Sequence, residues 1–162
     1  MVQALLTTTL LSIVCLIGTA VTGFRTGHPW HFLSGIFATV LVTLAQSMTM
    51  FYFIGTGKQV KDLVAEQPVP NGAEFVRRTK VFKAKVFPTA LWAMLFTMAT
   101  MILGGGVDTH VWWMPAWVHG VLAAASLYFN LKAFWLDVKY MFEDNLLREE
   151  LAQVLQTTPA AK

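Results

Sequence analysis

Four long apolar stretches divide the chain, at residues 2–24, 29–54, 86–103 and 115–135. Lys132 is the only charged residue in them. An apolar run of about 18 or more residues is long enough to cross a bilayer as a helix. A membrane-spanning barrel would need strands of about 10 residues with strict alternation of apolar and polar positions, and these runs are longer and do not alternate. The pattern therefore predicts an all-α fold, an integral membrane four-helix bundle.

Helical patterns continue beyond two of these spans. Residues 58–64 contain helix-forming side chains and no breaker, and a segment rich in Pro and Gly then interrupts the chain at 67–72. Asn71 followed by Glu74 predicts a capped start for the next helix. After the fourth span, Leu and Tyr recur at helical spacing over residues 136–155, with acidic residues between them. We expect helical extensions on one side of the membrane, with this acidic tail packed against the basic loop.

The composition agrees with a membrane protein. Of the 162 residues, 56% are hydrophobic and 13% are charged, whereas a typical soluble domain has about 25% charged residues. These values exclude a disordered chain and an ordinary water-soluble globule. The single cysteine, Cys15, excludes an intrachain disulfide. We expect one transmembrane domain over residues 1–162, with residues 2–24 retained as a span because no typical signal-peptide pattern is present.

The charges indicate an orientation. Seven of the 12 Lys and Arg residues lie between Lys58 and Lys85. Cytoplasmic loops of membrane proteins carry an excess of cations, so we expect loop 55–85 in the cytoplasm. Four spans then place both termini there too (N-in/C-in), including the tail 136–162. The net charge of +3 is thus explained by the membrane topology. It does not indicate nucleic-acid binding, because no fold for such binding is present. The expected location is a bacterial inner or plasma membrane, in contact with its lipid.

One hairpin pattern occurs twice along the chain. A helix end that carries glycine is followed by His, and then by Pro, Trp and His at the start of the next apolar run. The first copy contains His28, Pro29, Trp30 and His31, and the second contains His110, Pro115, Trp117 and His119. The pattern predicts two repeated helical hairpins, related by an axis along the membrane normal.

All four histidines fall on the predicted outer side: His28, His31, His110 and His119. His31 and His119 lie about one turn inside their helices, and the positions that follow them at helical spacing are small or polar. Small residues permit close helix packing and leave room for a flat macrocycle. In a four-helix bundle the two imidazoles could face each other across the core and ligate a haem iron.

Three hypotheses remain open. In the first, which we favour, His31 and His119 are axial ligands of haem b, and the protein passes electrons between quinone or a partner membrane subunit and an acceptor outside. In the second, His28, His31, His110 and His119, with Asp108, surround zinc, copper or a similar ion. In the third, the histidines are interfacial polar side chains of a cofactor-free structural or accessory protein.

Other kinds of site find no support in the residues. No Ser–His–Asp or Cys–His arrangement can be assembled, because Cys15 lies within the first span, so we do not expect an enzyme acting on its own. The spans contain no chain of acidic residues of the kind that would predict a proton pump. Asp137 lies near the inner end of the fourth span, where we expect its side chain to reach the interface. Gln46 and Asn130 lie deeper and are expected to face the bundle interior.

In architecture, a membrane four-helix bundle with histidines paired on facing helices resembles membrane b-type cytochromes and the haem-carrying anchors of respiratory complexes. The resemblance implies haem binding, electron transfer and assembly with partner membrane subunits or as a homo-oligomer. Many such cytochromes have histidines on both sides of the membrane for two haems, whereas all four lie on one side here, which argues against electron transfer across the whole membrane. No family motif matches along the chain, and no family is assigned.

Overall fold

The computed structural model describes residues 2–24, 30–109 and 115–157, apart from the side chain of Asp108. The described chain forms four helices and no strand: α1 (Val2–Gly23), α2 (Trp30–Glu66), α3 (Gly72–Asp108) and α4 (Ala116–Thr157). At about 1.5 Å per residue, the shortest helix is about 33 Å long and the longest about 63 Å. The predicted all-α fold is confirmed, and each helix is long and apolar enough to cross a membrane.

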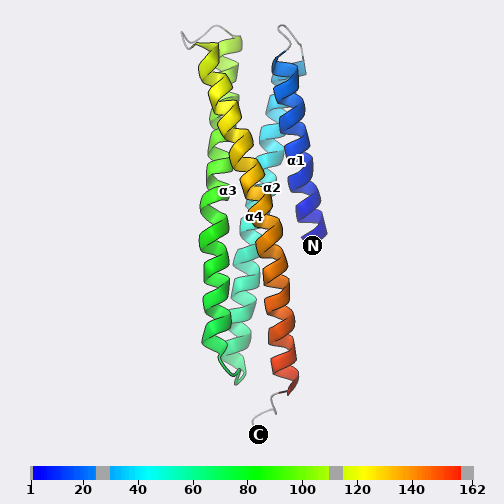
Figure 1. Cartoon of the computed structure of the whole chain (residues 1–162), viewed down its shortest axis with the longest axis vertical. Coiled ribbons are helices and arrows are strands. Elements are labelled where there is room, and N and C mark those ends of the chain that lie inside the picture. Colours follow the sequence, from blue (N-terminus) through cyan, green and yellow to red (C-terminus); the bar gives the residue numbers. More distant parts are fainter. Residues whose placement is uncertain (1, 25–29, 110–114, 158–162) are drawn as a thin grey trace.

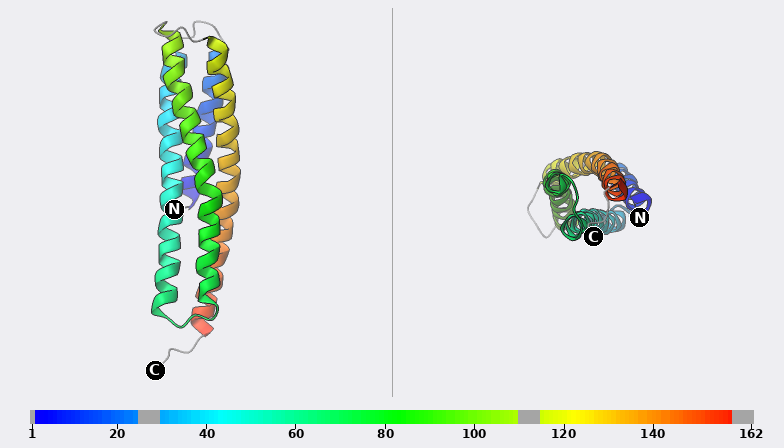
Figure 2. Two further views of the ribbon diagram at one scale, coloured as in Figure 1. Left: turned by 90° about the vertical axis from the view of Figure 1, so that its left-hand side faces the viewer. Right: turned by 90° about the horizontal axis from the view of Figure 1, so that it is seen from below.

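The four helices form one elongated bundle in which consecutive helices are antiparallel (Figure 1). Seen along the bundle, they follow the order α1, α2, α3, α4 around a ring, so that α2 and α4 lie on a diagonal (Figure 2). The contacts agree, because α2 and α4 touch far less than neighbours in the ring do. Only α1 is short. The bundle therefore has a four-helix half, which includes α1, and a three-helix half beyond the start of α1 (Figure 1).

The four-helix half is apolar outside and partly polar inside. Val14, Phe37, Leu95 and Val121 are each more than half exposed on its surface. Buried polar residues lie in its interior: Thr9, Ser12, Gln46, Thr97, Ser126 and Asn130. This distribution is the reverse of a water-soluble bundle and fits a surface covered by lipid, where polar side chains turn to the bundle interior.

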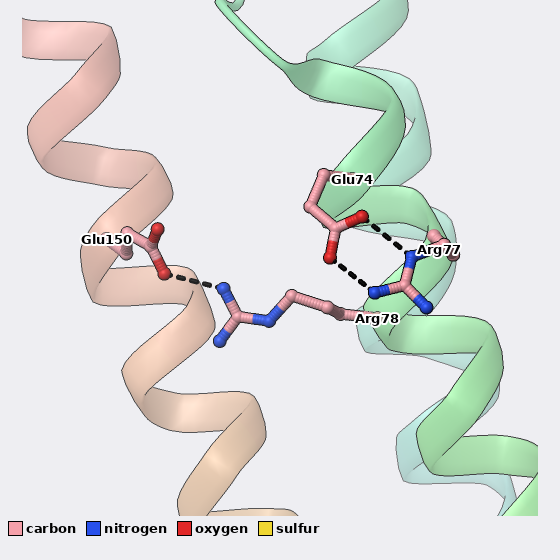
Figure 3. Close-up of polar contacts among 4 residues, drawn as sticks. All are labelled: Glu74, Arg77, Arg78 and Glu150. Carbon is pink, nitrogen blue, oxygen red and sulfur yellow. Dashed lines mark hydrogen bonds and ion pairs between the residues drawn. The ribbon is translucent and has the colours of Figure 1, made fainter.

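The three-helix half carries most of the charge, and the buried apolar cluster of the molecule extends from the start of α1 into it. Phe53, Phe75 and Leu147 are among its buried apolar side chains. Arg78 on α3 donates to Glu150 on α4 over 2.6 Å (Figure 3). The predicted packing of the acidic tail against the basic segment is thus confirmed in this pair, as are the helical extensions of α2 and α4.

Two local predictions are wrong. Asn71 does not cap α3 with its side chain, because its backbone is left-handed (φ 56°, ψ 28°) and not in the extended conformation of a side-chain cap. Glu74 instead forms an ion pair with Arg77 over 2.7 Å (Figure 3). The run Gly104–Gly106 was expected to end its helix, but α3 continues through it to Asp108.

Candidate functional site

Two histidine side chains meet inside the four-helix half. His31 lies in the first turn of α2 and His119 in the first turn of α4. Their ring centroids are 6.0 Å apart and their planes are inclined by 81°. Because α2 and α4 lie on a diagonal of the bundle (Figure 2), the two rings meet across its interior. The structure thus brings together the two residues that the sequence nominated as paired ligands.

Each imidazole is held by the carbonyl of a neighbouring helix. The Nδ1 atom of His31 lies 3.1 Å from the backbone oxygen of Thr19 on α1. The Nδ1 atom of His119 lies 3.1 Å from the backbone oxygen of Thr100 on α3. A carbonyl oxygen can only accept, so Nδ1 carries the hydrogen in both rings, and in the neutral form Nε2 holds a free lone pair. This is the arrangement by which proteins fix a histidine as a metal ligand.

A glycine lies against each imidazole. A Cβ atom on Gly23 would come within 2.7 Å of Cε1 of His31, and a Cβ atom on Gly104 within 2.5 Å of Cε1 of His119. Such distances are shorter than any carbon–carbon contact, so only glycine permits these ring positions. Each ring is therefore fixed twice, by a carbonyl and by a glycine of the preceding helix.

A cavity surrounds the pair between all four helices. Its volume is about 710 Å³ when the part that opens to solvent is counted, and water molecules can enter about 90 Å³ of it. Much of its wall is small or carries a hydroxyl group, including Ala20, Gly35, Ala38, Thr39, Thr97, Thr100, Ala123 and Ser126. Leu16, Phe32, Met101 and Leu127 supply larger apolar surface. The site is thus a mainly apolar chamber in which two imidazoles are the basic groups.

The other predicted ligands are not placed. His28 and His110 lie outside the described residues, as does the side chain of Asp108. Within the described ranges, no group of three or more His, Cys, Asp or Glu side chains is arranged to hold a metal ion. The described part of the site therefore offers two imidazole ligands.

Sequence reasoning placed the inward faces well and missed the supports of the rings. Gln46 and Asn130 are buried, as expected. The contacts from Thr19, Thr100, Gly23 and Gly104 were not foreseen. A signal for them exists, because a threonine precedes a glycine by four residues at the end of both helices.

The placement of Asp137 corrects a prediction. We expected its side chain to reach the membrane interface, but it is 0% exposed, and neither carboxylate oxygen has a hydrogen-bond partner among the described residues. The reason is its position on α4, 18 residues after His119 on the helix face that points into the bundle. Lys132, which lies on another face, is exposed.

Comparison with known protein families, with curated proteins and with solved structures finds no match to this chain.

Proposed function

We propose that this chain is a membrane electron-transfer subunit that holds haem b between His31 and His119. One observation carries the proposal: two imidazoles meet across the bundle with their ring centroids 6.0 Å apart, and the Nδ1 atom of each lies 3.1 Å from a backbone carbonyl oxygen. A haem iron held by two imidazoles exchanges single electrons with its surroundings. The protein supplies the ligands, their orientation and a chamber of low polarity.

The ligand count favours haem over a bare metal ion. A porphyrin provides four equatorial nitrogens, so the protein has to supply only two axial ligands. Zinc in a structural site takes four protein ligands. The described residues offer two imidazoles and no third His, Cys, Asp or Glu beside them. Two protein ligands are the number that haem requires.

The spacing of the rings fits the same ligand. With both Nε2 atoms turned toward one metal ion, two metal–nitrogen bonds of about 2 Å, with each ring centre roughly 1 Å behind its nitrogen, would put the centroids roughly 6 Å apart. The observed separation is 6.0 Å. Gly35 and Ala123 lie one turn beyond the two histidines and line the cavity. The small size of both residues leaves space beside the imidazole rings.

The matching supports of the two rings favour the repeated hairpin. His31 contacts Thr19 and Gly23, and His119 contacts Thr100 and Gly104. Both pairs place the glycine four residues after the threonine. We therefore infer that α1–α2 and α3–α4 are copies of one unit, and that the site lies on the axis between them.

The orientation follows from the charges. The cations between Lys58 and Lys85 lie on the three-helix half. Because cations are in excess on the cytoplasmic side of membrane proteins, we assign that half and both termini to the cytoplasm. The histidine pair then lies near the outer surface. In this arrangement the subunit receives electrons from quinone or a partner membrane subunit and delivers them to an acceptor outside. A homo-oligomer or a larger complex would cover part of the apolar surface.

An optical spectrum of the purified protein, oxidised and then reduced, tests the proposal. We expect a Soret band and sharp bands of the reduced haem, with about one haem per chain. His31→Ala and His119→Ala should each lose these bands. Added imidazole should restore them in both variants, because it can occupy the space of the missing side chain, and this control separates loss of a ligand from loss of the fold.

Other results of the spectrum and of a metal analysis would support the alternative hypotheses. A protein expressed with sufficient haem that shows no haem bands and no stoichiometric metal is a cofactor-free accessory subunit. Stoichiometric zinc or copper without haem supports the wider histidine set with His28 and His110. Haem bands that survive both alanine substitutions contradict the assignment of the ligands.

A further inference from the structure

Several polar groups inside the bundle have no partner. Gln46, Thr49, Asn130 and Asp137 are each at most 1% exposed. Both side-chain polar atoms of Gln46, the hydroxyl of Thr49, Oδ1 of Asn130 and both oxygens of Asp137 lack a hydrogen bond within the described residues. Proteins usually satisfy such atoms with internal water. We therefore expect water molecules along this part of the interior.

The positions of these groups form a line along the bundle. Asn130, Asp137 and Asp144 are spaced by seven residues on α4, so they share one face of the helix. Thr49 and Asp137 each lie 18 residues beyond a histidine of the pair. Since α2 and α4 run in the same direction from the pair (Figure 1), both lie at one level, about 27 Å along the bundle from the rings.

At one end this line reaches the surface of the three-helix half. The hydroxyl of Tyr52 donates to Oδ2 of Asp144 over 2.8 Å. Arg148 lies 3.3 Å from the same oxygen and also donates to the Tyr52 hydroxyl over 3.3 Å. The Asp144 side chain is 1% exposed and that of Arg148 is 35% exposed. The hydrogen-bonded group thus connects the interior with bulk water.

At the other end the line reaches the histidine cavity. Asn130 donates to the Thr97 hydroxyl over 3.0 Å. That hydroxyl lies 2.7 Å from the hydroxyl of Ser126. Both Thr97 and Ser126 belong to the cavity wall that also contains His31 and His119. We call the whole line the polar column: Tyr52, Asp144, Thr49, Asp137, Gln46, Asn130, Thr97 and Ser126.

We propose that the polar column conducts protons between the surface of the three-helix half and the histidine cavity. Hydroxyl groups, carboxyl groups and water each accept a proton from one neighbour and release another to the next, so no other bond changes. Acidic side chains in the interior of membrane proteins commonly serve in such relays. This activity is additional to electron transfer, and the polar column is present whichever group the histidines hold.

Asp137 is the ionisable group at the middle of the column. On the facing stretch of α3 the buried side chains include the apolar Val86 and the hydroxyl-bearing Thr89, and the first buried side chain of α1 is the apolar Leu5. The histidine pair lies about 27 Å away on one side. On the other side, toward the three-helix half, lie the remaining titratable or charged groups that face the interior: Tyr52, Tyr140, Asp144, Arg148 and Lys83. Asp137 is thus the carboxyl group nearest the middle of the column, and we assign it the role of a proton carrier there.

Proton flux into vesicles tests the proposal. A group bound between the histidines would close the outer end of the path, so the reference protein is the His31→Ala variant, reconstituted with a pH-sensitive dye inside and a potassium diffusion potential across the membrane. We expect proton uptake clearly above that of protein-free vesicles. In the same background Asp137→Asn should lose this uptake. Asp62→Asn, which removes an exposed acid of α2, is the matched control and should keep it.

A second variant guards against misfolding. Gln46→Leu removes two polar atoms that have no partner, so it should fold at least as well as the reference protein while it also loses proton uptake. Uptake no greater than in protein-free vesicles, or equal uptake with Asp137→Asn and Asp62→Asn, would overturn the proposal. A spectrum separates this result from haem binding, since Asp137→Asn with both histidines intact should keep the haem bands.

Discussion

At the scale of single residues, the positions of the two imidazole rings depend on the absence of a Cβ atom at the glycine beside each ring. Gly23 and Gly104 have no Cβ, and each allows a ring carbon to lie where a Cβ atom would collide with it. The carbonyls of Thr19 and Thr100 then select the tautomer. A backbone carbonyl cannot be removed by substitution, so the glycines are the supports that an experiment can change.

Gly23→Ala and Gly104→Ala should therefore displace the imidazole rings and weaken the binding of haem that we propose. Loss of a group that orients a metal ligand typically costs about 10–100-fold in metal affinity, and we expect a loss of this size in a haem titration. Gly18→Ala and Gly120→Ala are matched controls, because a Cβ atom at either position meets nothing within 4 Å. Equal haem affinity in all four variants would contradict the role of the glycines.

Asp144, on the part of α4 beyond the span, gives a prediction about pH. Burial raises the pKa of its carboxyl group above the ordinary value of 3.8, and the bond from Tyr52 and the charge of Arg148 oppose this shift only partly. The folded state thus holds the proton to a higher pH than the unfolded state does. The stability that Asp144 contributes should fall as the pH rises through and above 3.8.

Thermal unfolding in detergent at about pH 4 and about pH 7, near and above the ordinary pKa range of the carboxyl group, checks this expectation. The unfolding temperature of the wild type relative to Asp144→Asn should be lower at the higher pH. Taking the difference from this variant removes the contribution of the other acids. A relative stability that rises with pH would show that the pKa of Asp144 is lowered in the folded state.

At the scale of the helices, two kinds of polar contact join α3 to α4. In the four-helix half, the buried amide of Asn130 donates to the hydroxyl of Thr97 and to the backbone of α4. In the three-helix half, Arg78 pairs with Glu150, and their side chains are 32% and 54% exposed. The first contact is buried, whereas solvent screens the second.

Asn130→Ala should consequently destabilise the fold more than Arg78→Gln does. We expect about 1–2 kcal/mol for the asparagine, because its removal leaves a buried hydroxyl with one bond fewer and a void beside it. The exposed ion pair should contribute less than about 1 kcal/mol. Unfolding by denaturant in mixed micelles measures both, and a larger effect of Arg78→Gln would reverse this ranking.

The helices themselves could be predicted from the sequence because lipid leaves few choices. Uncharged runs of bilayer length have to be helical, and inward faces follow from the 3.6-residue period, which places Gln46 and Asn130 correctly. The end of α3 and the cap at Asn71 could not be predicted, since they depend on local backbone geometry. The burial of Asp137 was missed because its distance from the span end suggested an interface position, while its helix face pointed inward.

At the scale of the whole molecule, polarity is graded along the bundle as well as across it. The four-helix half has an apolar surface and two imidazoles near one end, and the three-helix half carries the cations of α2 and α3. A bilayer of about 30 Å hydrocarbon thickness matches the length of α1, which the longer helices exceed on one side only (Figure 1). The molecule thus has a charged end and an apolar end, and the cations of the charged end are the basis for the orientation that we propose.

Cysteine labelling can determine that orientation. In a Cys15→Ala background, Gln67→Cys marks the turn between α2 and α3, and Pro115→Cys marks the start of α4; both positions are exposed. If the cations hold the three-helix half inside the cell, a membrane-impermeant maleimide should label position 115 on intact cells and position 67 only after permeabilisation. Labelling of position 67 from outside would show that the molecule has the opposite orientation. The histidine pair would then lie near the cytoplasm, and electrons and protons would reach it from the opposite sides to those we propose.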